Sequence, residues 1–208
     1  ENMIEAFKHN EDIHTKTASQ VFNVNMEDVT GELRNAAKAV NFGIVYGKSD
    51  FGLADDLNIS VKQAKEYIES YFNKYKKIKE YMDETIEKAT QNGYVTTIFN
   101  RRRYIPEIKS SNFMERNRGK RFAMNAPIQG SAADIIKIAM VNVYKKLEEK
   151  NLKSKLILQV HDELIVEAIE EEVDIVKVIV KEEMENAVAM DVHLDVDLNI
   201  GYSWYEAK

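Results

Sequence analysis

The chain has 208 residues, of which 31% are charged, and its net charge at pH 7 is −6. This length allows one large or two small domains, and the absence of cysteine excludes disulfides and thiolate metal sites. The sequence has no apolar run of about twenty residues and no signal-peptide pattern, so we expect no membrane partner. The acidic balance argues against a protein that simply coats DNA, because such binding depends on neutralising phosphates.

The first informative segment places two cations and two aromatic rings four positions apart, at Arg34, Lys38, Phe42 and Tyr46, and then reaches Gly47. Four residues turn a helix through about 400°, so these side chains share one stripe of a predicted helix. The stripe suits a ligand with a polyphosphate at one end and a flat base at the other. The alternative is a solvated cationic face that continues into a packed aromatic one.

The following segments predict helices and then a short hairpin. Ser60 and Gln63 form a capping-box pattern, and the apolar residues after them keep helical spacing, with a break expected near residues 73–76. We interpret the aromatic residues of this long stripe as core. Short strands are expected at residues 94–98 and 102–105, on either side of a polar turn.

A basic band covers residues 100–121, which hold eight basic residues against two acidic ones. Such a band fits a groove that follows a nucleic-acid backbone, and solvated helix faces are the alternative explanation. Helices are predicted at residues 112–125 and 128–150. We expect Pro127 to divide them and to begin the second helix, where a missing N–H costs nothing.

Two aliphatic runs at residues 156–160 and 163–168 flank two polar residues, a pattern that predicts a tight β-hairpin. Its tip presents His161, Asp162 and Glu163 together. Adjacent carboxylates on rigid strands are suitable oxygen ligands for Mg²⁺, which prefers one or two carboxylates plus substrate phosphates. An ordinary hairpin with a charged turn is the alternative.

After the hairpin, the pattern predicts an amphipathic helix at residues 171–188 and a last strand at residues 194–200. The predicted elements are mostly helical, with a few antiparallel strands. The sequence therefore predicts an α+β fold that is mainly helical.

Together these segments resemble the family A DNA polymerases, the bacterial DNA polymerase I type. The stripe looks like the nucleotide-binding helix of that family's fingers, and residues 159–163 look like its catalytic hairpin. The resemblance runs from about residue 1 to residue 208, and it implies fingers helices plus an incomplete antiparallel palm sheet with a catalytic β-hairpin. Further stretches fit the family in the same order, at residues 12–18, 101–104, 121–135 and 201–208.

The resemblance implies a palm edge at residues 1–8, a fingers subdomain at residues 9–112 and part of a palm subdomain at residues 113–208. The family's other essential aspartate belongs to an upstream segment that has no match here. The chain is therefore expected to be a carboxyl-terminal fragment of a polymerase.

The stripe matches the residues with which the family binds an incoming deoxynucleotide (dNTP). The resemblance implies that Arg34 and Lys38 bind the triphosphate, that Phe42 lies against the sugar and base, and that Tyr46 lies near the template. His14 matches a further phosphate contact. Charge builds on the leaving pyrophosphate during phosphoryl transfer, so Lys38 is also a catalytic candidate that would stabilise this charge or donate a proton. In this family, phenylalanine at the position of Phe42 is associated with rejecting nucleotides that lack the 3′-hydroxyl.

Other candidates would bind primer–template DNA. Arg121, Asn125 and Gln129 lie four residues apart and offer donors to minor-groove acceptors, which look nearly alike across correct base pairs. Helix-surface polarity is the alternative, and Pro127 is expected to disturb the position of Gln129. The remaining DNA-binding candidates are His161, Arg101, Arg102 and Arg103.

Asp162 is the strongest candidate for a metal ligand, with Glu163 beside it, and both are also catalytic candidates. The resemblance implies two Mg²⁺ ions about 3.5–4 Å apart, in a site completed by a carboxylate outside this chain. Three functions remain open at this point. In the first, the parent protein is a DNA-directed DNA polymerase and this chain is inactive alone. In the second, the chain is a non-catalytic module that binds a nucleotide or primer–template DNA. In the third, His161 and Asp162 belong to an HD-type metal phosphohydrolase, which would need further ligands on helices.

The expected partners are primer–template DNA, a dNTP and the remainder of the parent polymerase chain, in the cytoplasm of a bacterium and associated with its nucleoid. Removing a sheet's partner strand exposes an edge, so the isolated chain is also expected to dimerise, swap strands or aggregate.

Overall fold

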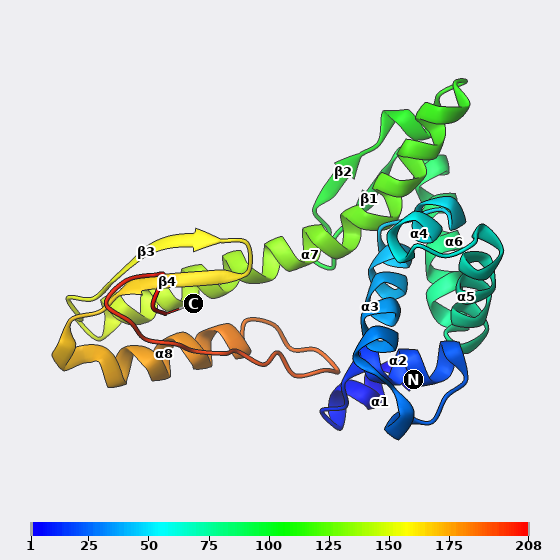
Figure 1. Ribbon diagram of the computed structural model, residues 1–208. Coiled ribbons are helices and arrows are strands. Elements are labelled where there is room, and N and C mark those ends of the chain that lie inside the picture. Colours follow the sequence, from blue (N-terminus) through cyan, green and yellow to red (C-terminus); the bar gives the residue numbers. More distant parts are fainter. Residues whose placement is uncertain (1, 208) are drawn as a thin grey trace. The chain divides into compact units, whose positions relative to one another are not determined.

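The computed structural model describes residues 2–207, which form two compact units that divide between Ile128 and Gln129. The described chain is mainly helical, with two separate two-stranded antiparallel sheets, and this confirms the predicted α+β class (Figure 1). Within this described part, no helix combines the length and the apolar character that crossing a membrane would require.

The first unit is built mostly from short helices, and the long helix α7, Phe113–Glu149, begins in it and continues into the second unit. Its other elements are α1 Asn2–Lys8, α2 Ile13–Phe22, η1 Met26–Asp28, α3 Gly31–Val45, α4 Asp50–Leu57, α5 Val61–Lys74, α6 Lys76–Asn92, β1 Tyr94–Thr96, β2 Arg102–Tyr104 and η2 Pro106–Lys109. The elements that complete the second unit are β3 Lys155–Val160, β4 Glu163–Glu167, η3 Glu170–Glu172 and α8 Val173–Glu185.

Polar caps fix the starts of several helices in the first unit. The Asp12 carboxylate accepts hydrogen bonds from the first backbone N–H groups of α2, and Thr30 caps α3. The predicted capping box at Ser60 and Gln63 is confirmed, with both reciprocal hydrogen bonds present. The predicted break also occurs: α5 and α6 are separated by Tyr75, whose φ of −114° and ψ of 56° are not helical.

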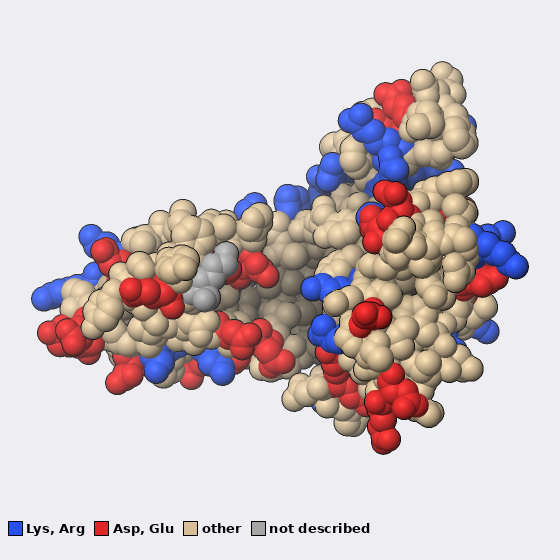
Figure 2. Space-filling model, in the orientation of Figure 1, with Lys and Arg blue, Asp and Glu red and all other residues tan. Residues whose placement is uncertain are grey.

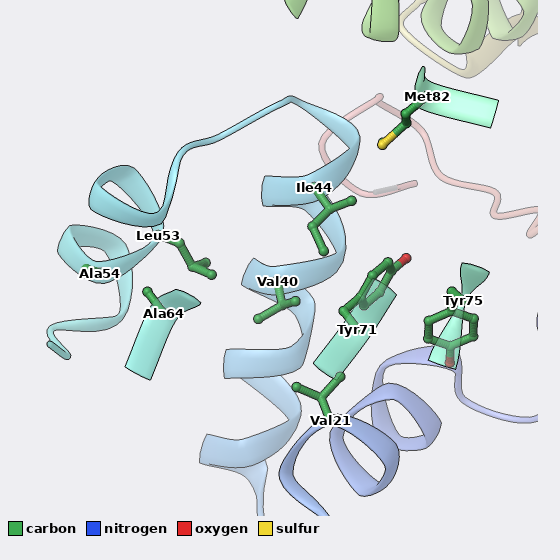
Figure 3. Packing of buried hydrophobic residues seen from close by; sticks show 9 residues of the cluster. All are labelled: Val21, Val40, Ile44, Leu53, Ala54, Ala64, Tyr71, Tyr75 and Met82. Carbon is green, nitrogen blue, oxygen red and sulfur yellow. The ribbon is translucent and has the colours of Figure 1, made fainter. Parts of the chain in front are cut away.

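The core of the first unit joins α2, α3, α4, α5 and α6 (Figure 3). Tyr71 and Tyr75 are only 1% and 5% exposed, so the aromatic stripe of α5 and α6 is core there, as predicted. Tyr81, farther along α6, is 46% exposed and departs from that pattern. The nine buried residues of this cluster are Val21, Val40, Ile44, Leu53, Ala54, Ala64, Tyr71, Tyr75 and Met82.

Helix α7 corrects the prediction that Pro127 divides two helices, because the helix runs through this residue. Proline lacks the N–H that would bond to the carbonyl four residues earlier, a cost of about 3 kcal/mol in a helix interior. Tertiary packing offsets this cost, since Ala123 and Ala126 are buried in a second hydrophobic cluster. Gly119 adds a close approach: a Cβ there would lie 2.6 Å from the backbone nitrogen of Ile108.

In the second unit, β3 and β4 form the predicted hairpin, with Val160 paired to Glu163 across a two-residue turn. His161, the first residue of the turn, has a φ of +53°, the sign that tight hairpin turns require at this position. Apolar residues of α7, the hairpin and α8 form one cluster, in which Val143 is fully buried.

Glu172 ties η3 to the segment before β3. Its carboxylate accepts hydrogen bonds from the backbone N–H groups of Lys153 and Ser154 and from the Ser154 hydroxyl, at 2.6–3.0 Å. The bond from the Lys153 backbone and then those from Ser154 lower the pKa of Glu172. The carboxylate therefore stabilises this junction mainly in its ionised form.

The predicted strand at residues 194–200 is wrong. Its side chains alternate as predicted, since Leu194, Val196 and Leu198 are half-buried between exposed residues. In the part of the chain that is described, however, each sheet contains only two strands, and this segment pairs with neither. The alternating side chains therefore give the segment one half-buried face, but its backbone forms no hydrogen bonds with a neighbouring strand of the described chain. The predicted helix at residues 171–188 exists in a shorter form, as α8.

Candidate nucleotide-binding residues and hairpin carboxylates

Helix α3 presents the predicted stripe in the expected order. Phe42 and Tyr46 are 45% and 43% exposed, and their rings lie nearly parallel, with centroids 6.3 Å apart and an interplanar angle of 16°. The Lys38 ammonium lies 6.0 Å from the centroid of the Phe42 ring. Large exposed rings at a helix end offer a stacking surface, and the neighbouring ammonium adds a positive charge at its edge.

Asp12 connects the stripe to α2. One carboxylate oxygen caps α2, and the other accepts hydrogen bonds from Arg34 Nε at 2.8 Å and Nη2 at 2.7 Å. The Arg34 side chain is still 42% exposed and has five N–H donors in all, so further donors remain for an anion. Desolvation opposes ionisation of Asp12, but the hydrogen bonds from Thr15 and Arg34 outweigh it and lower the pKa of this carboxyl group.

His14 stands in the first turn of α2, beside the stripe. Its ring centroid lies 5.8 Å from that of Phe42, and its Nδ1 atom lies 3.0 Å from the amide nitrogen of Asn41. Burial lowers the pKa of His14, and the nearby charges of Arg34 and Lys38 lower it further, against an opposing effect of Asp12. The structure therefore brings His14 together with the stripe, as the sequence predicted.

The end of α3 packs closely against α7. Gly47 has a φ of +64°, and a Cβ at this residue would lie 2.4 Å from Met124 Cε and 3.1 Å from Arg121 Cγ. Glycine is therefore favoured both by the backbone conformation and by the close approach. As a result, Arg121 lies beside the residue that follows Tyr46.

Asn125, one turn after Arg121 in α7, has a side-chain oxygen that is buried and accepts no hydrogen bond from the described residues. Gln129 is exposed, and it lies in the same continuous helix two residues after Pro127. The three predicted minor-groove residues thus share one helix, although Gln129 belongs to the second unit.

The basic band lies over aromatic rings. The Arg102 guanidinium carbon is 4.7 Å from the Tyr94 ring centroid, and the corresponding atoms of Arg103 and Arg118 are each 5.2 Å from the Phe122 centroid. Figure 2 shows the blue side chains gathered over β2 and the adjoining part of α7. Arg101 is also exposed. Consecutive strand residues point to opposite faces, so Arg102 and Arg103 serve different faces of the small hairpin.

The hairpin of the second unit exposes His161, Asp162 and Glu163 at its tip, as predicted. The Trp204 indole N–H donates to Glu163 Oε2 at 3.3 Å. Within residues 2–207, no ion pair or hydrogen bond engages the Asp162 carboxylate. Both carboxylates therefore remain accessible to a cation.

Among the described residues, the one group of three side chains spaced for a metal ion lies elsewhere, at Glu185, His193 and Asp195. His193 Nε2 is 3.9 Å from an oxygen of each carboxylate, and two of the three side chains are largely exposed. This spacing is that of a surface ion pair. Asp162 and Glu163 have no third histidine or carboxylate ligand in the described chain.

Sequence reasoning assigned no role to Asp12, Asn41 or Trp204. A helix-cap pattern before residue 13 is the signal that would have found Asp12. Asn41 follows Lys38 by three residues, so it lies near the same helix face, but asparagine at such a position has no distinctive pattern. The contact of Trp204 joins residues 41 positions apart and has no local signal.

The fold is that of a polymerase domain. The chain belongs to DNA polymerase family A, whose model matches residues 1–206. It is 61% identical to DNA polymerase I of Caldicellulosiruptor bescii and 55% identical to that of Bacillus subtilis, in each case over all of this chain and 24% of the relative. The chain thus spans about a quarter of the length of these curated relatives.

A solved structure agrees with this assignment. The polymerase domain of Pol1 from M. smegmatis, in complex with a DNA primer-template and dNTP, matches 98% of this chain and 36% of its own, with a TM-score of 0.93 and 45% identity.

Proposed function

We propose that this chain provides the nucleotide-binding side chains and part of the metal site of a longer DNA-directed DNA polymerase. In this proposal, residues 9–112 are its fingers, and residues 1–8 and 113–208 belong to its palm. The observation that carries the proposal is the grouping of a histidine, two cations and two exposed rings around α3. Because its proposed substrate is DNA, the parent polymerase would act at the nucleoid, in the bacterial cytoplasm.

Each side chain of this group has a chemical role in the proposal. Arg34 and Lys38 bind the triphosphate of the incoming dNTP, and His14 donates to one of its phosphate oxygens. Phe42 lies against the sugar and base, and Tyr46 lies near the template. Lys38 also stabilises charge on the leaving pyrophosphate or gives it a proton, since this charge grows during phosphoryl transfer.

The carboxylates of Asp162 and Glu163 fit Mg²⁺, because they are exposed oxygen ligands at the end of a rigid hairpin. The absence of a third ligand near them in the described residues supports a site completed by a carboxylate outside this chain. Bound Mg²⁺ would neutralise phosphate charge and activate the primer 3′-hydroxyl. His161 orients the primer end or the hairpin.

Primer–template DNA is the second proposed partner. Arg121, Asn125 and Gln129 donate to minor-groove acceptors, which are nearly the same across correct base pairs. Arginines in the basic band contact the phosphate backbone. This role suits their guanidinium groups, which are exposed and lie over aromatic rings. These backbone-binding residues are Arg101, Arg102 and Arg103.

A nucleotide-binding titration tests the core of the proposal. A fluorescent dNTP analogue is titrated into the 208-residue chain and into the Lys38→Ala variant. Charge-assisted hydrogen bonds contribute about 1.5–3 kcal/mol, so we expect the variant to bind about 10-fold or more weakly. The matched control is Lys62→Ala, which removes the same charge from an exposed position on α5. Equal affinities for the two variants would contradict the proposal.

The second candidate function, a non-catalytic nucleotide or primer–template binding module, is favoured by the incomplete ligand set at the hairpin tip. We propose that it describes the isolated chain, which would bind but not extend a primer. Among the described residues, the β3–β4 sheet has only two strands and no further strand pairs with its edges. We propose that the isolated chain dimerises through these edges. A constant monomer mass in light scattering over a wide concentration range would exclude the dimer.

A further inference from the structure

Asn41 links the proposed phosphate contact His14 to the buried core of the first unit. Its amide nitrogen lies 3.0 Å from His14 Nδ1 and 3.2 Å from Thr17 Oγ1. Thr17 is fully buried, and its hydroxyl oxygen lies 3.5 Å from that of Tyr75, which is 5% exposed. A continuous series of polar contacts therefore runs from the core to the imidazole ring.

The orientation of the Asn41 amide decides which nitrogen of His14 accepts. A primary amide nitrogen carries two N–H donors, and the nitrogen of Asn41 lies 3.0 Å from His14 Nδ1 and 3.2 Å from Thr17 Oγ1. The Thr17 hydroxyl also lies 3.4 Å from the Asn41 amide oxygen, to which it donates. Because the atom that faces Nδ1 is the amide nitrogen, which can only donate, Nδ1 must be free of hydrogen. The reverse orientation would require a hydrogen on Nδ1 and would leave Nε2 as an acceptor, which repels a phosphate oxygen.

The charge state of His14 completes this assignment. Burial lowers the pKa of His14 from its ordinary value of 6.5, and the charges of Arg34 and Lys38 lower it further, against the opposing effect of the Asp12 carboxylate. The neutral ring is therefore the main form at pH 7. A neutral imidazole has one donor nitrogen and one acceptor nitrogen. Because Nδ1 accepts from Asn41, the hydrogen is carried by Nε2.

We infer that Asn41 is a positioning residue that holds His14 in the Nε2–H tautomer, so that this N–H donates to a phosphate oxygen of the bound nucleotide. The inference rests on the proposed function. It separates two tasks: Arg34 and Lys38 supply the positive charge, and His14 supplies a neutral, directed donor. Such a donor does not lose a charge as the pH rises above 7, so its contribution to binding stays constant there.

Nuclear magnetic resonance tests the tautomer without any activity measurement. Two-bond ¹H–¹⁵N spectra distinguish protonated from unprotonated ring nitrogens, and the His14→Gln variant identifies the signals of His14. We expect hydrogen on Nε2 only in the unmodified chain at pH 7. In Asn41→Asp, the new carboxylate should raise the pKa of His14 and protonate both nitrogens. Hydrogen on Nδ1 alone in the unmodified chain would overturn the inference.

Nucleotide affinity tests the role of that N–H. The amide nitrogen of glutamine reaches the place of Nε2, whereas that of asparagine reaches the place of Nδ1. We therefore expect His14→Gln to stay within about 3-fold of the unmodified chain for the fluorescent dNTP analogue, and His14→Asn to bind about 10-fold more weakly. Far-UV circular dichroism confirms that both variants fold.

The Lys38→Ala variant separates the two possible failures. If Lys38→Ala binds the nucleotide weakly while His14→Gln and His14→Asn bind it equally, the inferred role of Asn41 and His14 is overturned, but the proposed function still stands. If Lys38→Ala binds as well as the unmodified chain, the proposed function fails, and this inference fails with it.

Discussion

Two glycines in the same region are predicted to respond differently to substitution by alanine. Gly47 has a φ of +64°, and a Cβ there would lie 2.4 Å from Met124 Cε and 3.1 Å from Arg121 Cγ. The left-handed conformation costs an L-residue about 1–2 kcal/mol. The end of the Met124 side chain is flexible and can move, so the contact adds about 1 kcal/mol. We expect Gly47→Ala to destabilise the first unit by about 2–3 kcal/mol.

Gly43 is the matched control, since it lies inside α3 one turn earlier. A Cβ there would lie 3.6 Å from Leu53 Cδ1 and 3.7 Å from Lys48 Cβ, which are ordinary van der Waals distances. Alanine also loses less backbone entropy than glycine on forming a helix, by about 0.5–1 kcal/mol. Gly43→Ala is therefore expected to be neutral or stabilising.

Urea unfolding followed by circular dichroism measures both effects. With a slope of about 1–3 kcal/mol per molar urea, the Gly47→Ala midpoint should fall by about 1 M or more, and the Gly43→Ala midpoint should stay or rise. Where the two units unfold in separate transitions, the shift belongs to the transition of the first unit. Equal midpoints for Gly47→Ala and the unmodified chain would refute the reasoning, as would an equal loss in both variants.

Three further substitutions follow from the contacts described above. Because its hydrogen bonds lower the pKa of Glu172, the stability that it contributes is present above about pH 4.5 and is lost as the pH falls below that value. We expect the unfolding free energy, measured from pH 7 to pH 3, to show this loss in the control variant Glu171→Gln but not in Glu172→Gln. Identical pH curves for the two variants would contradict the role of Glu172. Ser60→Ala removes the capping box and should lower the unfolding free energy by about 1 kcal/mol, and an unchanged urea midpoint would count against that role. Phe42→Tyr should relax discrimination against dideoxynucleotides in a polymerase that contains this chain, because the added hydroxyl can replace a hydrogen bond of the missing 3′-hydroxyl; equal incorporation ratios would reject the idea.

Local patterns predicted the elements whose signals are short-range. The capping box at Ser60, the break at Tyr75 and the β3–β4 hairpin each depend on a few neighbouring residues, and all three are present. The stripe of α3 was predictable for the same reason, because four-residue spacing fixes which side chains share a helix face.

The errors arose where distant contacts decide the structure. Pro127 is a helix breaker locally, but buried alanines around it hold α7 together. Residues 194–200 alternate like a strand, yet a strand also needs a hydrogen-bonding partner, which no local pattern supplies. Sequence spacing cannot show either the packing or the missing partner.

The candidate site divides in the same way. Arg34, Lys38 and Phe42 were found because they lie on one helix. Asp12 and Asn41, which fix Arg34 and His14, act between α2 and α3, across 22 and 27 positions of sequence. Their roles become visible only when the two helices are packed together.

Primer extension tests the central claim most directly. The assay supplies Mg²⁺, deoxynucleotides and a primed template to the 208-residue chain, to a longer chain that contains it together with an upstream carboxylate, and to the Asp162→Ala variant of that longer chain. The account predicts extension by the longer chain alone, with loss of the activity in Asp162→Ala. Extension by the 208-residue chain, or undiminished extension by the longer Asp162→Ala variant, would contradict it.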